Sequence, residues 1–268
     1  MPGNIFKGQK HGIFNTNSTN SVRASITIVE SIKEKQGFRI SPLIRFKSEE
    51  RERVLNKDVL MKLLPETRQR ITTDQRMYYK VFKELEPIYK QWREEATGVF
   101  GDLLTKEKTE YSLTIPTTCR YFTTATIYPL NRTGKRILYF KDEDSRDYGY
   151  CLFNSSFAYW FWRVFDGSIT YPEYLLRSIP IKYDKELIKE HKEQIKNIQS
   201  KETTYITKKL NAKQIQENVK FPETIRNELN EIMFTNFELK EEVTLLDRIH
   251  KNNIFKEKER ARNKRERF

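Results

Sequence analysis

The chain of 268 residues lacks most of the motifs from which catalytic sites are built. It contains no Gly-x-Gly, which excludes the usual dinucleotide and phosphate-binding loops. Its two cysteines, Cys119 and Cys151, are too few for a disulfide framework or a four-ligand zinc site, and they fit a reducing compartment. Its three histidines, His11, His191 and His250, lie far apart and without ligand spacing. We therefore predict no catalytic residue and no metal site.

Long apolar segments are also missing. The longest apolar and aromatic run lies between Asn154 and Gly167, well short of the roughly 20 residues that span a bilayer. The first residues, MPGNIFKGQKHG, have no apolar signal core. We therefore expect a cytoplasmic protein with no membrane partner, and we predict that the run from Asn154 to Gly167 is a buried core helix, because it is apolar on every side.

Positive charge and aromatic residues are abundant. Lys and Arg number 50 against 37 Asp and Glu, a formal net charge of +13, and aromatic residues make up 13% of the chain. Most of the chain should fold, because disorder normally comes with few aromatic residues. The excess charge suits a polyanionic partner, since each cation placed on a phosphate releases counterions. A basic, solvated surface without nucleic acid is the alternative.

The residue patterns favour an α+β fold, with a small lobe of β-hairpin and helix, a mixed α/β domain and a helical C-terminal segment. The boundaries are expected to give residues 1–105, 106–183 and 184–268. The predicted strands form two hairpins, and the predicted helices include one that Pro87 should kink. The first hairpin pairs residues 23–31 with 38–46, and the second pairs 118–130 with 136–140. The predicted helices are a short charged helix after residue 46, the helix at 73–92, the core helix, and the helices after residue 184.

Candidate binding residues gather around the second hairpin. The turn NRTGKR between its strands carries three cations, and a mixed-charge loop, KDEDSRD, follows the second strand. Cations, amides and aromatic rings on a rigid scaffold are the groups that contact phosphates and bases. For the aromatic rings the alternative is core packing, and for the cations an ordinary solvated turn. The candidate DNA-binding residues are Arg120, Tyr121, Arg132, Lys135, Arg136 and Arg146, with Arg163 and Asp166 at the polar end of the core helix.

The segment RYFTTATIYPLNRTGKRILYF, followed by YGYCLFNSSFAYWFWRVFDG and then LLRSIPI, resembles the C-terminal target-recognition part of adenine-specific DNA methyltransferases of the TaqI and Eco57I restriction-modification type. The front part, with GNIFKGQKHGIF, RASITIVES and ISPLIRFKSEER, resembles the last strands of the same family's catalytic domain. The resemblance covers roughly residues 1–183. It implies a lobe that holds duplex DNA while a catalytic domain flips an adenine out of the helix.

The family's methyl-donor loop, Phe-x-Gly-x-Gly, and its catalytic Asn/Asp-Pro-Pro-Tyr/Phe motif have no counterpart here. The resemblance therefore implies a module that is inactive alone, with S-adenosylmethionine bound by a missing catalytic half and with double-stranded DNA and a methyltransferase or endonuclease subunit as partners. Three alternatives stay open: a complete small nuclease or methyltransferase with unrecognised motifs, a helical protein-interaction subunit, and an RNA-binding protein.

Overall fold

The computed structural model divides the chain into two compact units. One comprises Met1–Glu86 with Lys251–Phe268, and the other comprises Pro87–His250. The boundaries predicted at residues 105 and 183 both fall inside the second unit, so the segments on either side of them pack together. The structure describes residues 4–6, 22–24, 37–42, 45–46, 51–66, 68–69, 79–119, 122–165, 169–211 and 214–239.

The first unit contains a three-stranded sheet of order β2-β1-β3. Its strands are β1 (Asn4–Phe6), β2 (Val22–Ala24) and β3 (Arg45–Phe46), followed by α1 (Arg51–Val54) and α2 (Lys57–Lys62). β1 pairs antiparallel with β2 and parallel with β3. The described parts of the predicted first hairpin therefore do not pair with each other, because a strand from the start of the chain lies between them. The short charged helix after residue 46 is confirmed by α1.

The helix predicted at 73–92 is shorter and begins later. Residues 79–82 are not helical; η2 (Lys83–Leu85) and α3 (Glu86–Glu95) follow them, while residues 73–78 lie outside the described part. The predicted kink at Pro87 was wrong, because this proline occupies the first turn of α3. A backbone N–H has no intrahelical partner there, so proline favours the start of a helix rather than bending it.

The second unit has a three-stranded antiparallel sheet of order β5-β7-β6. The second predicted hairpin is confirmed only in part, because β7 exists but pairs with β6, which precedes the predicted partner strand. In the predicted strand 118–130, Thr118 and Thr126 make only isolated bridges. The strands of this unit from β4 to β8 are β4 (Gly98–Val99), β5 (Leu104–Thr105), β6 (Ser112–Pro116), β7 (Lys135–Phe140) and β8 (Pro180–Ile181), and the helical turn η3 (Phe100–Leu103) lies between β4 and β5. The strand β8 pairs with β4.

Seven helices and helical turns of the described part follow β7. The mixed-charge loop predicted after the second hairpin is in fact the start of α4, because Asp142 accepts a hydrogen bond from Ser145 N (2.7 Å) and Glu143 and Asp144 occupy the first turn, where acidic side chains favour a helix. The seven helices and helical turns are α4 (Glu143–Asn154), α5 (Ser156–Phe165), α6 (Glu173–Arg177), α7 (Lys185–Glu190), α8 (Lys192–Lys201), η4 (Glu202–Tyr205) and α9 (Glu223–Asn236).

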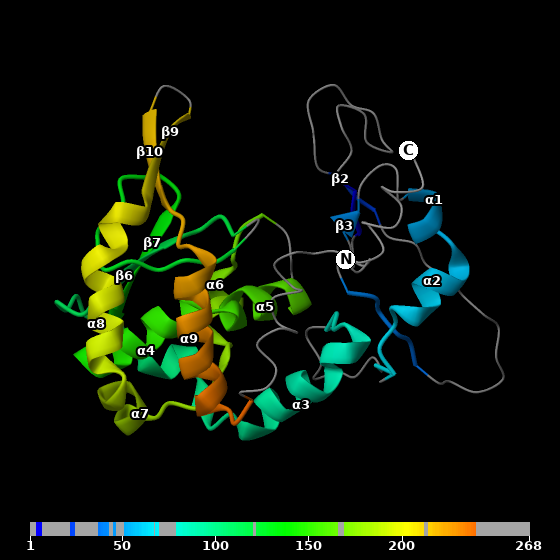
Figure 1. Cartoon of the computed structure of the whole chain (residues 1–268), viewed down its shortest axis with the longest axis horizontal. Helices are drawn as coiled ribbons and strands as arrows, with labels where there is room; N and C mark the ends of the chain where they lie inside the picture. Colours follow the sequence, from blue (N-terminus) through cyan, green and yellow to red (C-terminus); the bar gives the residue numbers. More distant parts are fainter. Residues whose placement is uncertain are drawn as a thin grey trace. The chain divides into compact units, whose positions relative to one another are not determined.

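The core helix predicted from Asn154 is confirmed as α5, whose residues from Ser156 to Val164 are all buried. Its aromatic side chains meet those of α3 and α9. Trp92 stacks on Trp160 with ring centroids 5.5 Å apart and meets Phe157 edge-on at 4.9 Å, while Phe157 lies 5.2 Å from Phe234. This cluster joins three helices far apart in the sequence, and together with the small sheets it confirms the α+β fold class (Figure 1).

Among the helices of the described residues, none has both the length and the apolar character that crossing a membrane requires.

Candidate nucleic-acid interface

A two-stranded antiparallel ribbon follows α8 and η4. It consists of β9 (Ile206–Asn211) and β10 (Gln214–Val219), paired in register from Ile206 opposite Val219 to Asn211 opposite Gln214. Figure 1 shows the ribbon extending away from the helices of its own unit. We predicted only helices after residue 184, so this part of the prediction was wrong. We call this element the ribbon.

The exposed charges of the ribbon and its two ends are all positive. Among the described residues from 201 to 220, every exposed charged side chain belongs to a lysine. These lysines are Lys201, Lys208, Lys209 and Lys220. The acidic residues of the same segment, Glu202 and Glu217, are only 2% and 6% exposed. In the described part of this segment, the charge presented to an approaching partner is therefore positive.

The two faces of the ribbon differ in chemistry, because successive side chains of a strand point to opposite sides. One face, here called the apolar face, ends in the cross-strand pair Leu210 and Ile215, which are 70% and 54% exposed. The other face carries hydroxyl, ammonium and amide groups, and we call it the amide face. Its members are Thr207, Lys209, Gln214, Gln216 and Asn218.

The cationic turn predicted from the sequence lies against the ribbon. Arg132 Nη1 donates to Asn218 Oδ1 at 2.7 Å, its Nε donates to Gly134 O at 3.0 Å, and its Nη2 donates to Thr118 Oγ1 at 3.3 Å. Burial lowers the pKa of the Arg132 guanidinium, which nevertheless stays charged at neutral pH. Arg132 therefore braces the ribbon against the sheet.

Backbone bonds complete this attachment. Glu217 N donates to Asn131 O at 2.8 Å, and Asn131 N donates to the Glu217 carboxylate at 2.8 Å. Thr133 N donates to Gln216 Oε1 at 3.2 Å. The turn thus lies along β10 and holds the base of the ribbon in a fixed orientation.

The β9 side of the ribbon's base is held by Glu202, in the turn η4 that precedes β9. Its carboxylate accepts hydrogen bonds from Tyr128 N at 2.5 Å and Ile127 N at 3.3 Å. Burial raises the pKa of this carboxyl, although the two backbone donors act in the opposite direction. Both strands are therefore tied, at the base of the ribbon, to the segment between β6 and β7.

Lys135 and Arg136, the other cations of the predicted turn, also bond within the chain. Lys135 Nζ donates to Leu130 O at 2.7 Å. Arg136 Nη1 donates to Tyr171 O at 2.9 Å, and its Nε lies 3.9 Å from the Glu173 carboxylate. These contacts give both side chains a structural role in the turn.

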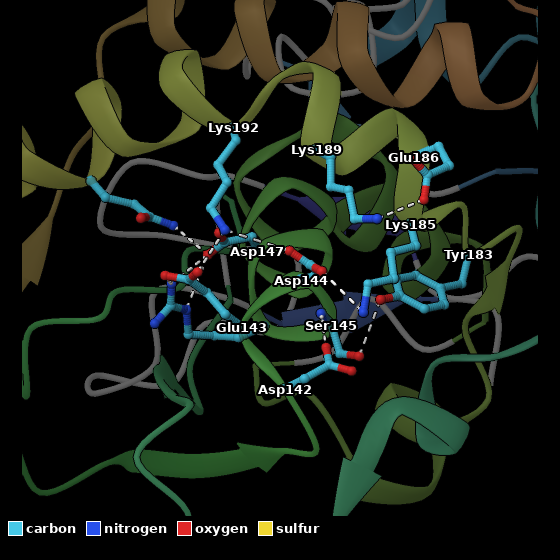
Figure 2. A network of polar contacts seen from close by, with 12 residues as sticks. Asp142, Glu143, Asp144, Ser145, Asp147, Tyr183, Lys185, Glu186, Lys189 and Lys192 are labelled. Carbon is cyan, nitrogen blue, oxygen red and sulfur yellow. Dashed lines mark hydrogen bonds and ion pairs between the residues drawn. The ribbon is translucent and has the colours of Figure 1, made fainter.

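Arg146 lies in a network of charged groups where α4 meets α8, and Figure 2 labels three other members, Glu143, Asp147 and Lys192. Its Nε and Nη2 donate to Asp147 Oδ1 at 3.0 and 2.7 Å, and Nη2 lies 3.3 Å from Glu143 Oε1. Gln199 Nε2 donates to the same Asp147 oxygen at 2.8 Å, and Lys192 Nζ lies 2.7 Å from Glu143 Oε2. The hydrogen bond from Lys192 is the main reason that the pKa of Glu143 is lowered.

The same network extends to α7. Lys185 Nζ lies 3.2 Å from Asp144 Oδ2, and Ser145 Oγ donates to Tyr183 OH at 3.3 Å (Figure 2). The charged start of α4 therefore fixes α7 and α8, and α8 leads directly into the ribbon. In the described structure, Arg146 is part of this support.

Four predicted residues remain, one of which the structure describes. Arg163 is 5% exposed within α5. Arg120, Tyr121 and Asp166 lie outside the described residues. Of the eight candidates, the structure brings Arg132 into direct contact with the ribbon.

Catalytic groups are sparse in the described part of the chain, where no cluster of three or more His, Cys, Asp or Glu side chains could hold a metal ion. Cys119 and Cys151 are both buried. Burial raises the pKa of the Cys151 thiol above its usual range, which disfavours the nucleophilic thiolate.

Comparisons of the chain with protein families, with curated proteins and with solved structures found no match.

Proposed function

We propose that this protein is the duplex-DNA-binding, target-recognition module of an adenine-specific DNA methyltransferase or restriction-modification system. The observation that carries the proposal is the projecting ribbon, on which Lys208 and Lys209 are exposed, with Lys201 and Lys220 exposed at its base and the nearby Glu202 and Glu217 buried. A catalytic part that this sequence does not contain would bind S-adenosylmethionine and transfer the methyl group.

The shape of the ribbon supports DNA as the partner. The major groove of B-form DNA, about 12 Å wide, admits a two-stranded β-ribbon. Lysines along such a ribbon lie close to the phosphates that border the groove, and each phosphate contact releases counterions. The attachments of Asn131, Arg132 and Glu202 keep the ribbon from folding back onto the sheet. A methyltransferase needs such a rigid lobe, because the flipped base leaves a distorted duplex that must be held.

The proposal is tested by measuring the affinity of the full chain for a fluorescent duplex of random sequence at several salt concentrations. We expect a Kd of about 10⁻⁴–10⁻⁶ M near physiological salt, the usual range for non-specific binding, and tighter binding at low salt. The double variant Lys208→Ala, Lys209→Ala should bind more weakly, and the slope of log K against log salt should fall by about 1.8 if both lysines contact phosphates.

The matched control is Lys106→Ala, Lys108→Ala, which removes two exposed lysines from the loop between β5 and β6. This control should keep the wild-type slope. Absence of duplex binding at low salt, or equal losses in the two double variants, would overturn the proposal.

Two further measurements separate the alternatives. Binding of S-adenosylmethionine to this chain alone, detected by calorimetry, or metal-dependent cleavage of the duplex would favour a complete enzyme. Tighter binding of an RNA duplex than of a DNA duplex of the same length and sequence would favour an RNA-binding protein.

A further inference from the structure

We propose that the amide face of the ribbon determines sequence preference, with Gln214 and Gln216 reading adenines through the major groove and Lys209 reading an adjacent guanine or phosphate. This inference rests on the proposed DNA-binding function and adds to it the residues and the bases that they recognise. The ribbon lies after the part of the chain that resembles methyltransferases, which covers roughly residues 1–183.

The register places these three side chains together. Lys209 pairs with Gln216 across the two strands, and Gln214 is two residues farther along β10 on the same face. Lys209 and Gln214 are exposed, and Gln216 is partly exposed. The amide face thus offers an ammonium group on β9 that lies opposite one carboxamide of β10 and diagonal to a second, on strands about 5 Å apart.

The base of the ribbon orients Gln216. Its Oε1 accepts a hydrogen bond from Thr133 N at 3.2 Å, and neighbouring Asn218 is held by Arg132 at 2.7 Å. A glutamine amide has two N–H donors and an oxygen with two lone pairs, so one bond to Thr133 leaves the group able to bind a base edge. Side chains that are fixed before binding lose less conformational entropy when they bind.

The apolar face is poorly suited to the same task. Leu210 and Ile215 make no hydrogen bonds through their side chains. Lys208 Nζ lies 3.8 Å from the Glu217 carboxylate, which also accepts from Asn131 N. The uncharged groups that can form hydrogen bonds with a base edge therefore lie on the amide face.

The chemistry of the amide face favours adenine and the major groove. A glutamine amide can accept from the N6 amino group of adenine and donate to N7, and both atoms are presented in the major groove. A lysine can donate to O6 and N7 of guanine. The minor groove is only about 6 Å wide and presents similar acceptors for A·T and T·A pairs, so it would not use these donors and acceptors fully.

The experiment starts with the full chain and a pool of random DNA duplexes, from which tightly bound sequences are selected. Each adenine of the selected site is then replaced by 7-deazaadenine, which lacks the N7 acceptor. For wild-type protein, at least one replacement should raise Kd about 5- to 150-fold, the equivalent of about 1–3 kcal/mol.

In Gln214→Ala, or in Gln216→Ala, the natural site should be bound more weakly by a similar factor, and the replacement at the adenine that the lost amide contacted should have no further effect. The salt slope should change less than in the double lysine variant, because a neutral amide releases no counterion when it is removed. Asn197→Ala, which removes an exposed amide from α8, is the matched control and should keep full sensitivity to 7-deazaadenine.

The two proposals fail in different ways. If the wild-type protein binds duplex DNA but selects no sequence, or if both glutamine variants keep the full effect of every 7-deazaadenine, this inference is overturned and DNA binding stands. If the wild-type protein binds no duplex at low salt, the proposed function itself fails.

Discussion

The substitution Asn154→Ala tests how the segment that supports the ribbon is held in place. Asn154 Oδ1 accepts from Ala125 N at 2.9 Å, and its Nδ2 donates to Ala125 O at 2.9 Å. Asn154 and Ala125 are 4% and 0% exposed, so water cannot replace these bonds. An unsatisfied buried polar group costs about 1–3 kcal/mol. Loss of both bonds should therefore lower the free energy of unfolding by about 2–6 kcal/mol.

Urea unfolding followed by tryptophan fluorescence measures this change. Trp92 and Trp160 are buried in the core and provide the signal. Asn154→Asp should also be destabilising, because its second carboxylate oxygen would face the Ala125 carbonyl. Asn197→Ala, at an exposed position on α8, should change the stability by no more than about 0.5 kcal/mol. If Asn154→Ala were as stable as the Asn197→Ala control, the proposed attachment would be refuted.

Two further predictions concern packing and charge. Gly149→Ala should lower stability by about 1–3 kcal/mol in urea unfolding, because a Cβ there would lie 2.8 Å from Phe140 Cζ; a gain in stability would show that the ring moves aside. The lowered pKa of Glu143 gives a stabilising contribution that is complete above its unfolded pKa and is lost as pH falls through its lower folded pKa. In Lys192→Ala, the stability should therefore fall less than in the wild type as pH drops below about 4.5. The urea midpoints of the two proteins, measured across that pH range, test this prediction. A difference between their midpoints that does not change with pH would contradict it.

The sequence predicted the core better than the surface. The run Ser156–Val164 is apolar on all sides and therefore had to be buried, and α5 is buried along that length. Part of its cap is local, because Phe157 N donates to Ser155 Oγ at 3.4 Å, but Ser156 N donates at 2.7 Å to Asn230 Oδ1 on α9, and that bond could not be predicted. Capping by a residue that distant depends on tertiary packing.

The error at segment 118–130 has a physical cause, which is that its backbone groups bond to partners far away in the sequence. The segment 118–130 has the composition of a strand, yet Asn154 and Glu202 take hydrogen bonds that a neighbouring strand would otherwise take. The acidic run after β7 was read as a loop because it is charged, although Asp142 followed by two acidic residues is also a good start for a helix.

The ribbon was missed although its sequence contained a signal. The β-branched residues Ile206, Thr207, Ile215 and Val219 flank a short polar turn, which is typical of a hairpin. The surrounding Lys, Glu and Gln residues favoured a helical interpretation of the whole segment. Among the predicted cations, Arg132 contacts Asn218 and Thr118, which is a bracing role that the sequence did not reveal.

The most direct test of the central claim is site-directed cleavage of DNA from the ribbon. Leu210→Cys places a thiol at a side chain that is 70% exposed, and both native cysteines are buried, so a DNA-cleaving reagent can be attached selectively. Val99→Cys, at a 40% exposed position on β4, is the control. We predict strand cuts in a bound duplex from position 210 and few or none from position 99. Equal cutting from the two positions, or cutting from position 99 alone, would contradict the claim that the ribbon binds DNA.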